Sequence, residues 1–432
     1  MTTPTYLDGL LAPVVDEITA ENLQVSGTIP AELRGRYFRN GPNPKPGEDP
    51  GHWFVGPGMI HGIRLRDGKA EWYRNRWVRT AQLAGRPFVG PDGPDLTAVS
   101  ANTNVIRHAD KIFALVENGF PHEITPELFT VGAYDFKGRL TTAMTAHPKE
   151  DPDTGELHFF GYGFWAPYLT YHRLNAQGDL VESREIDVPG PTMMHDFAIT
   201  EHYVIWLDLP MVFDLESAGK GMAYQWSDAY GARLGVMSKQ TKQVQWFDVD
   251  PCYVFHVGNA HEDEGRVVLD AVRYSPNQMK ATWARIGGSP NPANETDGTT
   301  LHRWTLDLAS GGIKEEQLDD RHVEFPSMNE LHLGRPSQYL YAVTGNAIVK
   351  YDTVTGRTNA RELGRAPGEA EFVPRMDARF EDDGWLMSIV TDHDGTSSDL
   401  MIFEAAGLDW VAKIHLPRRV PSGFHGNWLA DS

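Results

Sequence analysis

Short runs of apolar residues alternate with polar turns along most of the chain, and this pattern predicts β-hairpins. The clearest example is GIRLRDGKAEWYRNRWV, in which two alternating runs, residues 62–66 and 69–78, flank Asp67 and Gly68. An Asp-Gly pair between two such runs is typical of a two-residue hairpin turn, because both residues tolerate the positive φ angles that this turn requires. We therefore expect two antiparallel strands joined at this pair.

The same pattern recurs six more times at similar but irregular spacing. The segments are VGAYDFKGRLTT, YHRLNAQGDLVESREI, GVMSKQTKQVQWFDV, RWTLDLASGGIKEEQL, IVKYDTVTGRTNARE and LMIFEAAGLDWVAKIHL. Further apolar runs, among them KIFALVEN, YVIWLDLP, RVVLDAVRY, YLYAVTG and WLMSIVTD, read as additional strands. Repeated hairpins of this kind indicate the blades of a β-propeller. A β-sandwich is the alternative, but one sandwich rarely needs 432 residues. We predict an all-β fold with one propeller domain over residues 1–432.

Three segments depart from the hairpin pattern. Residues 1–30 are expected to form an irregular N-terminal arm that wraps the body. Residues 210–234 mix apolar and polar positions without a β pattern, and they are the best candidate for a helix. Residues 281–300 are rich in Gly, Pro and Asn, so we expect an exposed loop there rather than a domain boundary.

Composition restricts the partners and the compartment. The formal net charge is −20 and no basic cluster opposes it, so we expect no binding to nucleic-acid phosphates. Cys252 is the single cysteine, which excludes an intramolecular disulfide and fits a reducing cytosol. The sequence shows neither a signal peptide nor the run of about 20 apolar residues that a membrane helix needs. We expect a cytoplasmic protein with at most transient membrane contact and no evident protein partner.

Four of the 17 histidines stand in similar, unusual contexts. His147, His195, His256 and His425 are flanked by apolar, Gly or Pro residues rather than by charged surface runs. Neutral imidazole is the commonest metal ligand and suits iron, zinc, copper and nickel. A single histidine is more often a surface or hydrogen-bonded core residue, so the four histidines indicate a metal site only when they are taken together. A closed fold with a central axis would bring them together, and we predict that they hold one metal.

The other histidines are expected to be structural. His261 is the nearest rival, because it follows His256 closely in an acidic stretch. On a strand, however, residues at i and i+5 point to opposite faces, so these two are not expected to share a metal.

Eight motifs are spread over nearly the whole chain: LRGRYFRNGPNP, NRWVRT, TAHPKEDPDTGEL, MMHDFAIT, FHVGNAHED, VEFPSMN, GEAEFVPR and PRRVPSGFHGNW. In this order they resemble the carotenoid cleavage oxygenase family. Members of that family are seven-bladed β-propellers with ferrous iron on the axis. The resemblance implies seven blades, with loops forming a lid over an axial metal site. It also implies that His147, His195, His256 and His425 bind one Fe(II) per chain.

In that family, three glutamates surround the histidines that bind iron, and the matching positions in this chain are Glu117, Glu324 and Glu369. A carboxylate that accepts the second ring N–H fixes the tautomer and the orientation of an imidazole. Glu117 and Glu324 lie within apolar runs, which favours burial. Glu371 would share a strand face with Glu369 and is an alternative to it.

Four neutral imidazoles leave an octahedral iron up to two open positions, which suits O2 beside a substrate. Zinc prefers four ligands, so a zinc site built from four histidines would be closed and structural. By resemblance, iron and O2 as co-substrate cleave a conjugated C=C bond and give two carbonyl products. No catalytic triad, P-loop or dinucleotide fingerprint indicates another reaction. We expect an oxidoreductase, a dioxygenase that cleaves an apocarotenoid-like polyene.

Three other functions are left open. They are cleavage of a stilbene or phenylpropenoid alkene, isomero-hydrolase chemistry without O2, and a metal-free propeller that serves as a binding scaffold. The lignostilbene branch of the family has a lysine directly before the first of the three glutamates, where this chain has Val116. A hydroxystilbene specificity of that type is therefore disfavoured.

A hydrophobic conjugated substrate needs an apolar route to the axis. The candidates for lining this tunnel, besides Val116, are aromatic residues beside the ligands and in the expected lid: Phe54, Phe120, Phe164, Trp165, Tyr168, Phe255 and Trp428. Residues 210–234 are expected to form part of the lid at the entrance.

Overall fold

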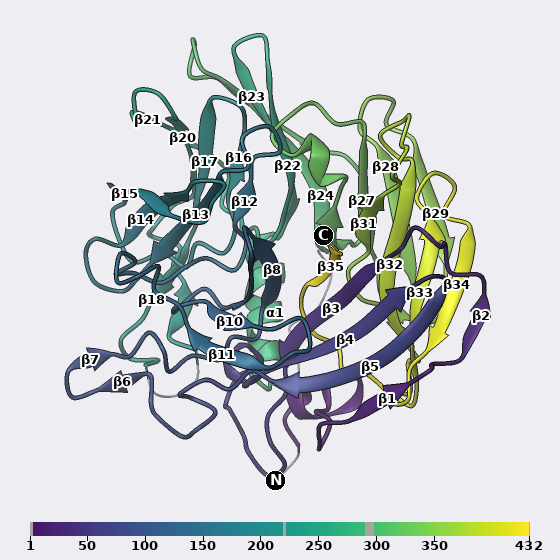
Figure 1. Cartoon of the computed structure of the whole chain (residues 1–432). Coiled ribbons are helices and arrows are strands. Elements are labelled where there is room, and N and C mark those ends of the chain that lie inside the picture. The colour runs from purple at the N-terminus through teal and green to yellow at the C-terminus, as the bar shows by residue number, and fades with distance from the viewer. Residues whose placement is uncertain (1–2, 219–221, 290–297, 432) are drawn as a thin grey trace.

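In this computed structural model, residues 3–218, 222–289 and 298–431 are described. β-Strands dominate them and form seven antiparallel sheets around a central axis (Figure 1). The chain is a seven-bladed β-propeller, as predicted. Two further small sheets lie outside the blades: β6 (Val89–Gly90) pairs with β7 (Gly93–Pro94), and β18 (Met211–Phe213) pairs with β19 (Tyr224–Trp226).

Each blade runs from an inner strand near the axis to an outer strand at the rim (Figure 1). From the axis outward, the strands are as follows. The first blade contains β35 (Gly426–Ala430), β3 (Gly35–Pro42), β4 (Gly58–Arg66), β5 (Lys69–Trp77) and β1 (Thr19–Glu21). The second contains β8 (Asn104–His108), β9 (Lys111–Leu115), β10 (His122–Ile124) and β11 (Thr130–Ala133). The third contains β12 (Lys149–Glu150), β13 (Leu157–Tyr162), β14 (Leu169–Leu174) and β15 (Leu180–Ile186). The fourth contains β16 (Ala198–Ile199), β17 (Tyr203–Asp208), β20 (Arg233–Ser238) and β21 (Val244–Asp248).

The fifth blade contains β22 (Val257–Asp263), β23 (Arg266–Arg273), β24 (Thr300–Asp307) and β25 (Ile313–Gln317). The sixth contains β26 (Glu324–Ser327), β27 (Tyr339–Val343), β28 (Ala347–Asp352) and β29 (Thr358–Glu362). The seventh contains β30 (Ala366–Pro367) and β31 (Glu371–Pro374), which both pair with β32 (Gly384–Thr391), and then β33 (Ser398–Glu404), β34 (Trp410–His415) and β2 (Val25–Gly27).

The two ends of the chain close the ring. β35 pairs with β3 at the inner edge of the first blade, with Gly35 opposite Ala430 and Arg39 opposite Gly426. β2 pairs with β34 at the outer edge of the seventh blade, while β1 pairs with β5 in the first. The arm at residues 1–30 is therefore more regular than predicted, because it supplies strands to two blades and links them.

The hairpin pattern locates most of the strands correctly. Asp67 and Gly68 join β4 to β5 with φ angles of 50° and 73°, as a tight hairpin turn requires. Six of the seven predicted hairpins are present; the exception is VGAYDFKGRLTT. There β11 is the outer strand of its blade, and the Leu140 amide donates to the Asp135 carbonyl in a turn instead of pairing with a strand. The chain leaves the blade at this point.

The prediction of a helix at residues 210–234 is wrong. The described part of this segment contains β18, β19 and the start of β20, and residues 219–221 lie outside the described part. Short strands separated by a long turn leave too few alternating positions to be recognised as β structure.

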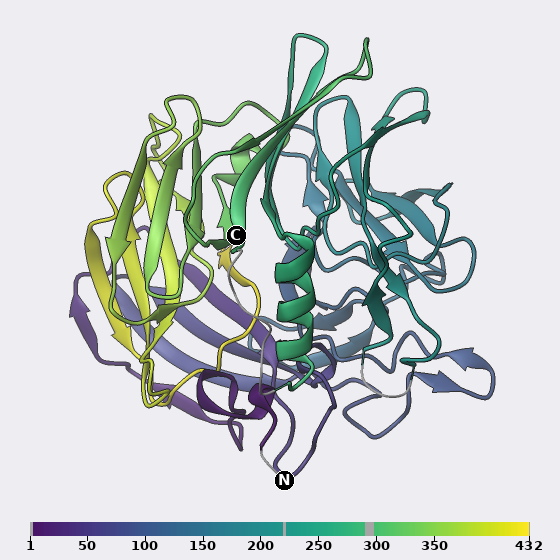
Figure 2. The same cartoon turned by 180° about the vertical axis from the view of Figure 1, so that it is seen from behind.

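Among the described residues, the α-helix is α1 (Pro276–Ile286), which overlaps the start of the loop predicted at residues 281–300. Residues 290–297 of that prediction lie outside the described part. The Ser275 hydroxyl caps its start by accepting a hydrogen bond from the Gln278 amide at 3.2 Å, and proline occupies the first turn. Figure 2 shows α1 near the middle of the ring, with its end beside the N-terminal segment. There Thr5 Oγ1 donates to the Arg285 carbonyl at 2.7 Å. Over the described residues, no helix has the length and apolar character to cross a bilayer.

The blades pack against one another through both of their faces, so their central strands are apolar on both sides. β32 is buried at every position, and β33 is buried at every position except Glu404. This packing fixes the inner strands around the axis and thereby places the residues at their ends.

Candidate metal centre

The four histidines predicted as ligands lie together at the inner ends of four blades. His147 precedes β12, His195 precedes β16, His256 precedes β22 and His425 precedes β35. All four are buried, and one ring nitrogen from each lies within 4.8 Å of those of the other three. Closure of the ring brings the first and last of them together although they are 278 residues apart in the chain.

The spacing of the nitrogens fits a six-coordinate metal. The Nε2 atoms of His147 and His425 are 2.8 Å apart. A metal about 2.1 Å from both, a usual imidazole–metal distance, would make an N–metal–N angle of about 84° with this 2.8 Å separation. That angle is near the 90° of an octahedron and well below the tetrahedral angle that zinc prefers. The separation of this pair therefore fits two neighbouring positions of an octahedral site better than two positions of a closed tetrahedral zinc site.

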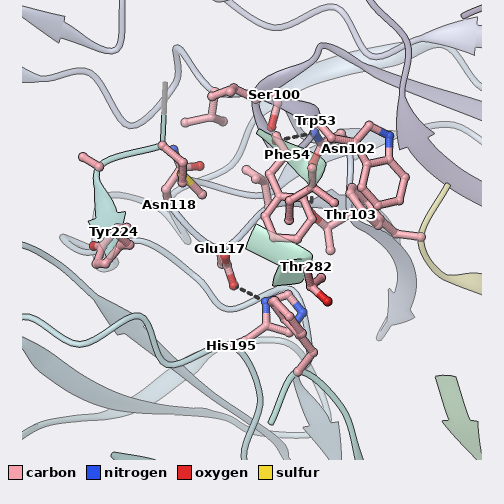
Figure 3. Close-up of a pocket in the computed structure, with 18 of the residues that line it drawn as sticks. Trp53, Phe54, Ser100, Asn102, Thr103, Glu117, Asn118, His195, Tyr224 and Thr282 are labelled. Carbon is pink, nitrogen blue, oxygen red and sulfur yellow. Dashed lines mark hydrogen bonds and ion pairs between the residues drawn. The ribbon is translucent and has the colours of Figure 1, made fainter. Parts of the chain in front are cut away.

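Three glutamates each form a hydrogen bond with the Nδ1 atom of one of these imidazoles. The distances from carboxylate oxygen to Nδ1 are 2.7 Å for Glu117–His195, 2.6 Å for Glu324–His256 and 3.1 Å for Glu369–His425. An Nδ1–H that donates to a carboxylate leaves Nε2 unprotonated and directed at the centre. Figure 3 shows the bond between Glu117 and His195 at the wall of a cavity.

The structure distinguishes Glu369 from its neighbour Glu371. Glu369 contacts the His425 ring and also accepts a hydrogen bond from the Gly426 amide at 2.9 Å. Glu371 instead accepts from the Trp428 amide at 3.4 Å. Burial raises the pKa of Glu371 well above its ordinary value, and the charges of nearby carboxylates add to this rise. Glu369 is the carboxylate that contacts a ligand.

Burial sets the protonation of the imidazoles. It lowers the pKa of His147 well below its ordinary value, and the other three histidines reinforce this effect. It also lowers the pKa of His256, although Glu324 opposes the shift. At His195 burial acts in the same direction, but the charge and hydrogen bond of Glu117 outweigh it and raise the pKa. His147 and His256 are therefore neutral at neutral pH, which is the form of imidazole that binds a metal.

His147 lacks a carboxylate of its own. Its Nδ1 is buried, and no described residue forms a hydrogen bond with that atom. Its position depends instead on the backbone, where the His147 amide donates to Thr145 Oγ1 at 3.2 Å.

Sequence reasoning missed Asp196, which is 1% exposed and lies directly after a ligand. One carboxylate oxygen is 2.9 Å from Lys149 Nζ, and the other accepts from the Val257 amide at 2.8 Å. Lys149 lies two residues after His147, and Val257 lies directly after His256. An acidic residue inside the otherwise apolar MMHDFAIT was the available signal.

Two aromatic residues at the centre were also missed. Phe325 stacks on the His256 ring with centroids 4.9 Å apart, and its φ of 51° lies within a bulge of β26. A positive φ at a bulky residue is strained, and the bulge directs the ring at the site. The Tyr274 hydroxyl donates to Glu324 at 2.6 Å and so fixes the carboxylate that holds His256.

A cavity of about 1460 Å³ reaches the metal centre. His195, His256 and His425 line it, whereas His147 does not. Of the residues predicted to line a tunnel, five do so: Phe54, Val116, Phe164, Trp165 and Phe255.

The other three predicted tunnel residues, Phe120, Tyr168 and Trp428, do not line this cavity. Phe120 and Tyr168 pack against the blade cores. The Trp428 indole lies over the backbone of Gly35 and packs into the core between the first and seventh blades. Trp428 lies on β35, where strand geometry turns its side chain away from the axis, whereas Phe120 and Tyr168 lie in connecting segments just before β10 and β14.

The segment at residues 210–234 borders the cavity. Phe213, Leu215, Met222 and Tyr224 contribute to its wall. Leu215 is 77% exposed and Trp165 is 58% exposed, so the cavity wall includes apolar side chains that also contact solvent. The four-histidine cluster, a candidate metal site, therefore lies next to a large, mainly apolar chamber.

The comparisons with known proteins agree with this architecture. The family model described as "Retinal pigment epithelial membrane protein" matches residues 11–430. A carotenoid cleavage oxygenase of Mycobacterium tuberculosis is 38% identical, with 98% of this chain and 97% of the relative covered. The carotenoid 9,10(9',10')-cleavage dioxygenase 1 of Arabidopsis thaliana is 34% identical, with 99% and 90% covered.

Solved structures show the same fold. The lignostilbene dioxygenase of Pseudomonas brassicacearum superposes with a TM-score of 0.88 at 27% identity, over 99% of each chain. Cobalt-substituted apocarotenoid oxygenase of Synechocystis gives a TM-score of 0.85 at 27% identity, over 97% of each chain. The family model spans nearly the whole chain and the relatives match over their full length, so this protein belongs to the carotenoid cleavage oxygenase family and is an oxidoreductase.

Proposed function

We propose that the enzyme is a non-haem Fe(II) dioxygenase that cleaves a conjugated C=C bond of an apocarotenoid-like polyene with O2 and gives two carbonyl products. The observation that carries this proposal is the joining of a buried four-histidine centre to a mainly apolar cavity of about 1460 Å³. A cavity of this size exceeds the usual range for small-ligand pockets and suits a long apolar substrate.

Ferrous iron, when bound by His147, His195, His256 and His425, would supply the activation of O2. The work of the chain is to hold the ligands and to shape the site. Glu117, Glu324 and Glu369 fix three imidazoles in the tautomer that presents Nε2. The aromatic wall, which includes Phe54 and Phe255, excludes water and holds a planar conjugated chain beside the centre.

A polyene fits the site better than a hydroxystilbene bound through a lysine. Val116 is 6% exposed and lines the cavity directly before Glu117, so it offers an apolar contact and no charge at that position. The relatives at 38% and 34% identity are named for carotenoids.

Stilbene or phenylpropenoid cleavage is the second candidate. It is supported by the TM-score of 0.88 with a lignostilbene dioxygenase and by 31% identity to a resveratrol cleavage oxygenase of Aspergillus fumigatus.

Two further features belong to this proposal. Residues 210–234 act as part of a lid at the entrance, because Phe213, Leu215 and Tyr224 border the cavity. The enzyme works in the cytoplasm, which its single, buried and unpaired Cys252 supports.

Metal analysis followed by product analysis tests the proposal. The protein is analysed for bound metals, loaded anaerobically with Fe(II), and incubated with an apocarotenal or a hydroxystilbene, with and without O2. We expect about one iron per chain and two carbonyl products from the apocarotenal only when O2 is present. Turnover without O2 would indicate isomero-hydrolase chemistry instead. Stoichiometric zinc, or no metal and no turnover, would indicate a binding scaffold.

A further inference from the structure

Three neutral polar side chains gather on the cavity wall beside Glu117. Asn118, Tyr162 and Tyr224 all line the cavity, and they come from three separate segments of the chain. Figure 3 shows Asn118 and Tyr224 on the same side of the cavity as Glu117. The rings of Tyr162 and Tyr224 lie nearly perpendicular, with centroids 5.9 Å apart. A polar cluster stands here within a mainly apolar wall.

Two members of this cluster have hydrogen-bonding capacity that the described chain does not use. Asn118 Oδ1 is buried, and no described residue donates a hydrogen bond to it. Tyr224 is 8% exposed and lines the same cavity, and no described residue forms a hydrogen bond with its hydroxyl. Buried polar atoms in folded proteins are nearly always paired, so the unpaired Asn118 oxygen, on the same cavity wall as a phenol without a partner, points to a ligand.

The electrostatics of the cluster restrict the ligand. Burial and the Glu117 carboxylate raise the pKa values of Tyr162 and Tyr224, so both phenols stay protonated and act as donors. The same carboxylate disfavours a second negative charge nearby. A carbonyl or ether oxygen accepts hydrogen bonds but cannot donate one to the Asn118 amide oxygen. A neutral hydroxyl group does both.

We propose that Asn118, Tyr162 and Tyr224 bind a hydroxyl group of the substrate and thereby fix which double bond lies at the metal. This inference rests on the proposed function, because it specifies the substrate class of that cavity. Glu117 joins the two sites: it follows Val116 on the cavity wall, precedes Asn118 and accepts from His195 at 2.7 Å. A bound hydroxyl therefore anchors the substrate a short distance from the centre.

Tyr162 has a second role besides hydroxyl binding, and the experiment must distinguish the two roles. Its hydroxyl interacts with Glu117, so a change at Tyr162 also affects a carboxylate that holds a ligand. Asn118 and Tyr224 form no such hydrogen bond and carry the test. Thr282 supplies a matched control, because it presents a hydroxyl to the same cavity from α1, and its Oγ1 accepts a hydrogen bond from Gln278 at 3.2 Å.

The hydroxyl can come from a ring-hydroxylated polyene or from a phenol. Binding is therefore measured by tryptophan fluorescence quenching on the anaerobic Fe(II)-loaded protein with two matched pairs. One pair is 4-hydroxystilbene and 4-methoxystilbene, and the other is an apocarotenal with and without a ring hydroxyl. We expect the hydroxylated member of one pair to bind about twofold to tenfold more tightly for each hydrogen bond gained. Tyr224→Phe and Asn118→Leu should each remove most of this preference, whereas Thr282→Val should preserve it.

A preference confined to the stilbene pair identifies a phenol, and one confined to the polyene pair identifies a ring hydroxyl; either result supports the subsite. Equal binding of both members of both pairs, or a preference that survives Tyr224→Phe and Asn118→Leu, would overturn it. Thermal melts show whether each variant is folded. If Tyr224→Phe is not folded, Asn118→Leu alone tests the subsite. The assay needs no turnover. A hydroxyl preference without cleavage therefore refutes the proposed function alone, and cleavage without a preference refutes the subsite alone.

Discussion

A carboxylate oxygen of Asp196 lies 2.9 Å from the ammonium of Lys149, and this ion pair joins the segments that carry His195 and His147. The second oxygen accepts from the amide of Val257, directly after His256. One carboxylate therefore connects three of the four segments that supply ligands. The two side chains are 2% and 14% exposed, so the pair is largely shielded from water.

Removing the charge of Asp196 should loosen the metal centre. Asp196→Asn keeps an acceptor for the Val257 amide but removes the ion-pair partner of the mostly buried Lys149, and breaking a buried pair in this way typically costs about 3–5 kcal/mol. We expect lower stability in guanidinium unfolding and iron binding weakened by about tenfold or more, as for other groups that orient ligands. The double variant Asp196→Asn with Lys149→Met should recover part of the stability. Wild-type stability and iron affinity in Asp196→Asn would show that the pair does not support the site.

The ligand assignment can be tested by removing single imidazoles. His195→Ala or His256→Ala should abolish iron retention, because three ligands and a vacant position hold the metal less tightly than four. The propeller should stay folded, since its core lies in the blades. Elemental analysis and far-UV circular dichroism measure the two effects. His261→Ala is the control: this histidine lies on β22 but outside the cluster, and its removal should leave iron in place. Full iron occupancy in either ligand variant would remove that residue from the set.

Glu117 and Glu371 offer a matched pair of carboxylates. Glu117→Gln should weaken iron binding or activity by about 10–100-fold, because a neutral amide no longer polarises the His195 ring as the carboxylate does. Glu371 accepts from the Trp428 amide and not from an imidazole of the cluster, so Glu371→Gln should change iron binding little. Iron titration of both variants measures the difference. An unchanged Glu117→Gln enzyme would show that Glu117 does not support His195.

A structural feature can be predicted from the sequence when the residues that determine it lie close together in the chain. The turn at Asp67 and Gly68 lies within one hairpin, so these two residues indicate the turn without information from the rest of the chain. The ligand histidines are identifiable because each has its own short motif. The failures at residues 210–234 and at α1 have a shared cause: short strands and a capped helix lie among Gly-rich segments that obscure their limits.

The site itself also depends on contacts between blades, which no short segment contains. Trp428 is three residues from a ligand yet packs between blades, because strand geometry sets its direction. Tyr224 and Asn118 are far apart in the chain and meet only in the folded cavity. The partner of Glu371 is a backbone amide, so no side-chain pattern could have separated it from Glu369.

Four histidines outside the four-histidine cluster, three of them buried and His302 half-buried, make stability depend on pH. Burial lowers their pKa values from 6.5 to about 4 at His52, about 3 at His158, about 4 at His172 and about 4 at His302. Between these values and 6.5, the unfolded chain binds more protons than the folded chain. The free energy of unfolding therefore falls as pH drops below about 6.5, and it is independent of these groups at higher pH. His195, whose pKa is raised, changes the free energy of unfolding with pH in the opposite direction, but it is one residue against these four.

Guanidinium unfolding of the metal-free protein at pH 7.5, 6.5 and 5.5 measures this slope in a range above the ordinary pKa values of carboxylates. We expect a clear loss of stability between pH 6.5 and 5.5. His52→Asn should reduce the slope, because asparagine removes one buried titrating group while its side-chain oxygen can accept from the Phe54 amide, as His52 Nδ1 now does at 3.1 Å. Each unit of pKa difference corresponds to about 1.4 kcal/mol, so a single group produces a measurable change. Equal stability at pH 5.5 and 7.5, or an unchanged slope in the variant, would show that these histidines are not held neutral by the fold.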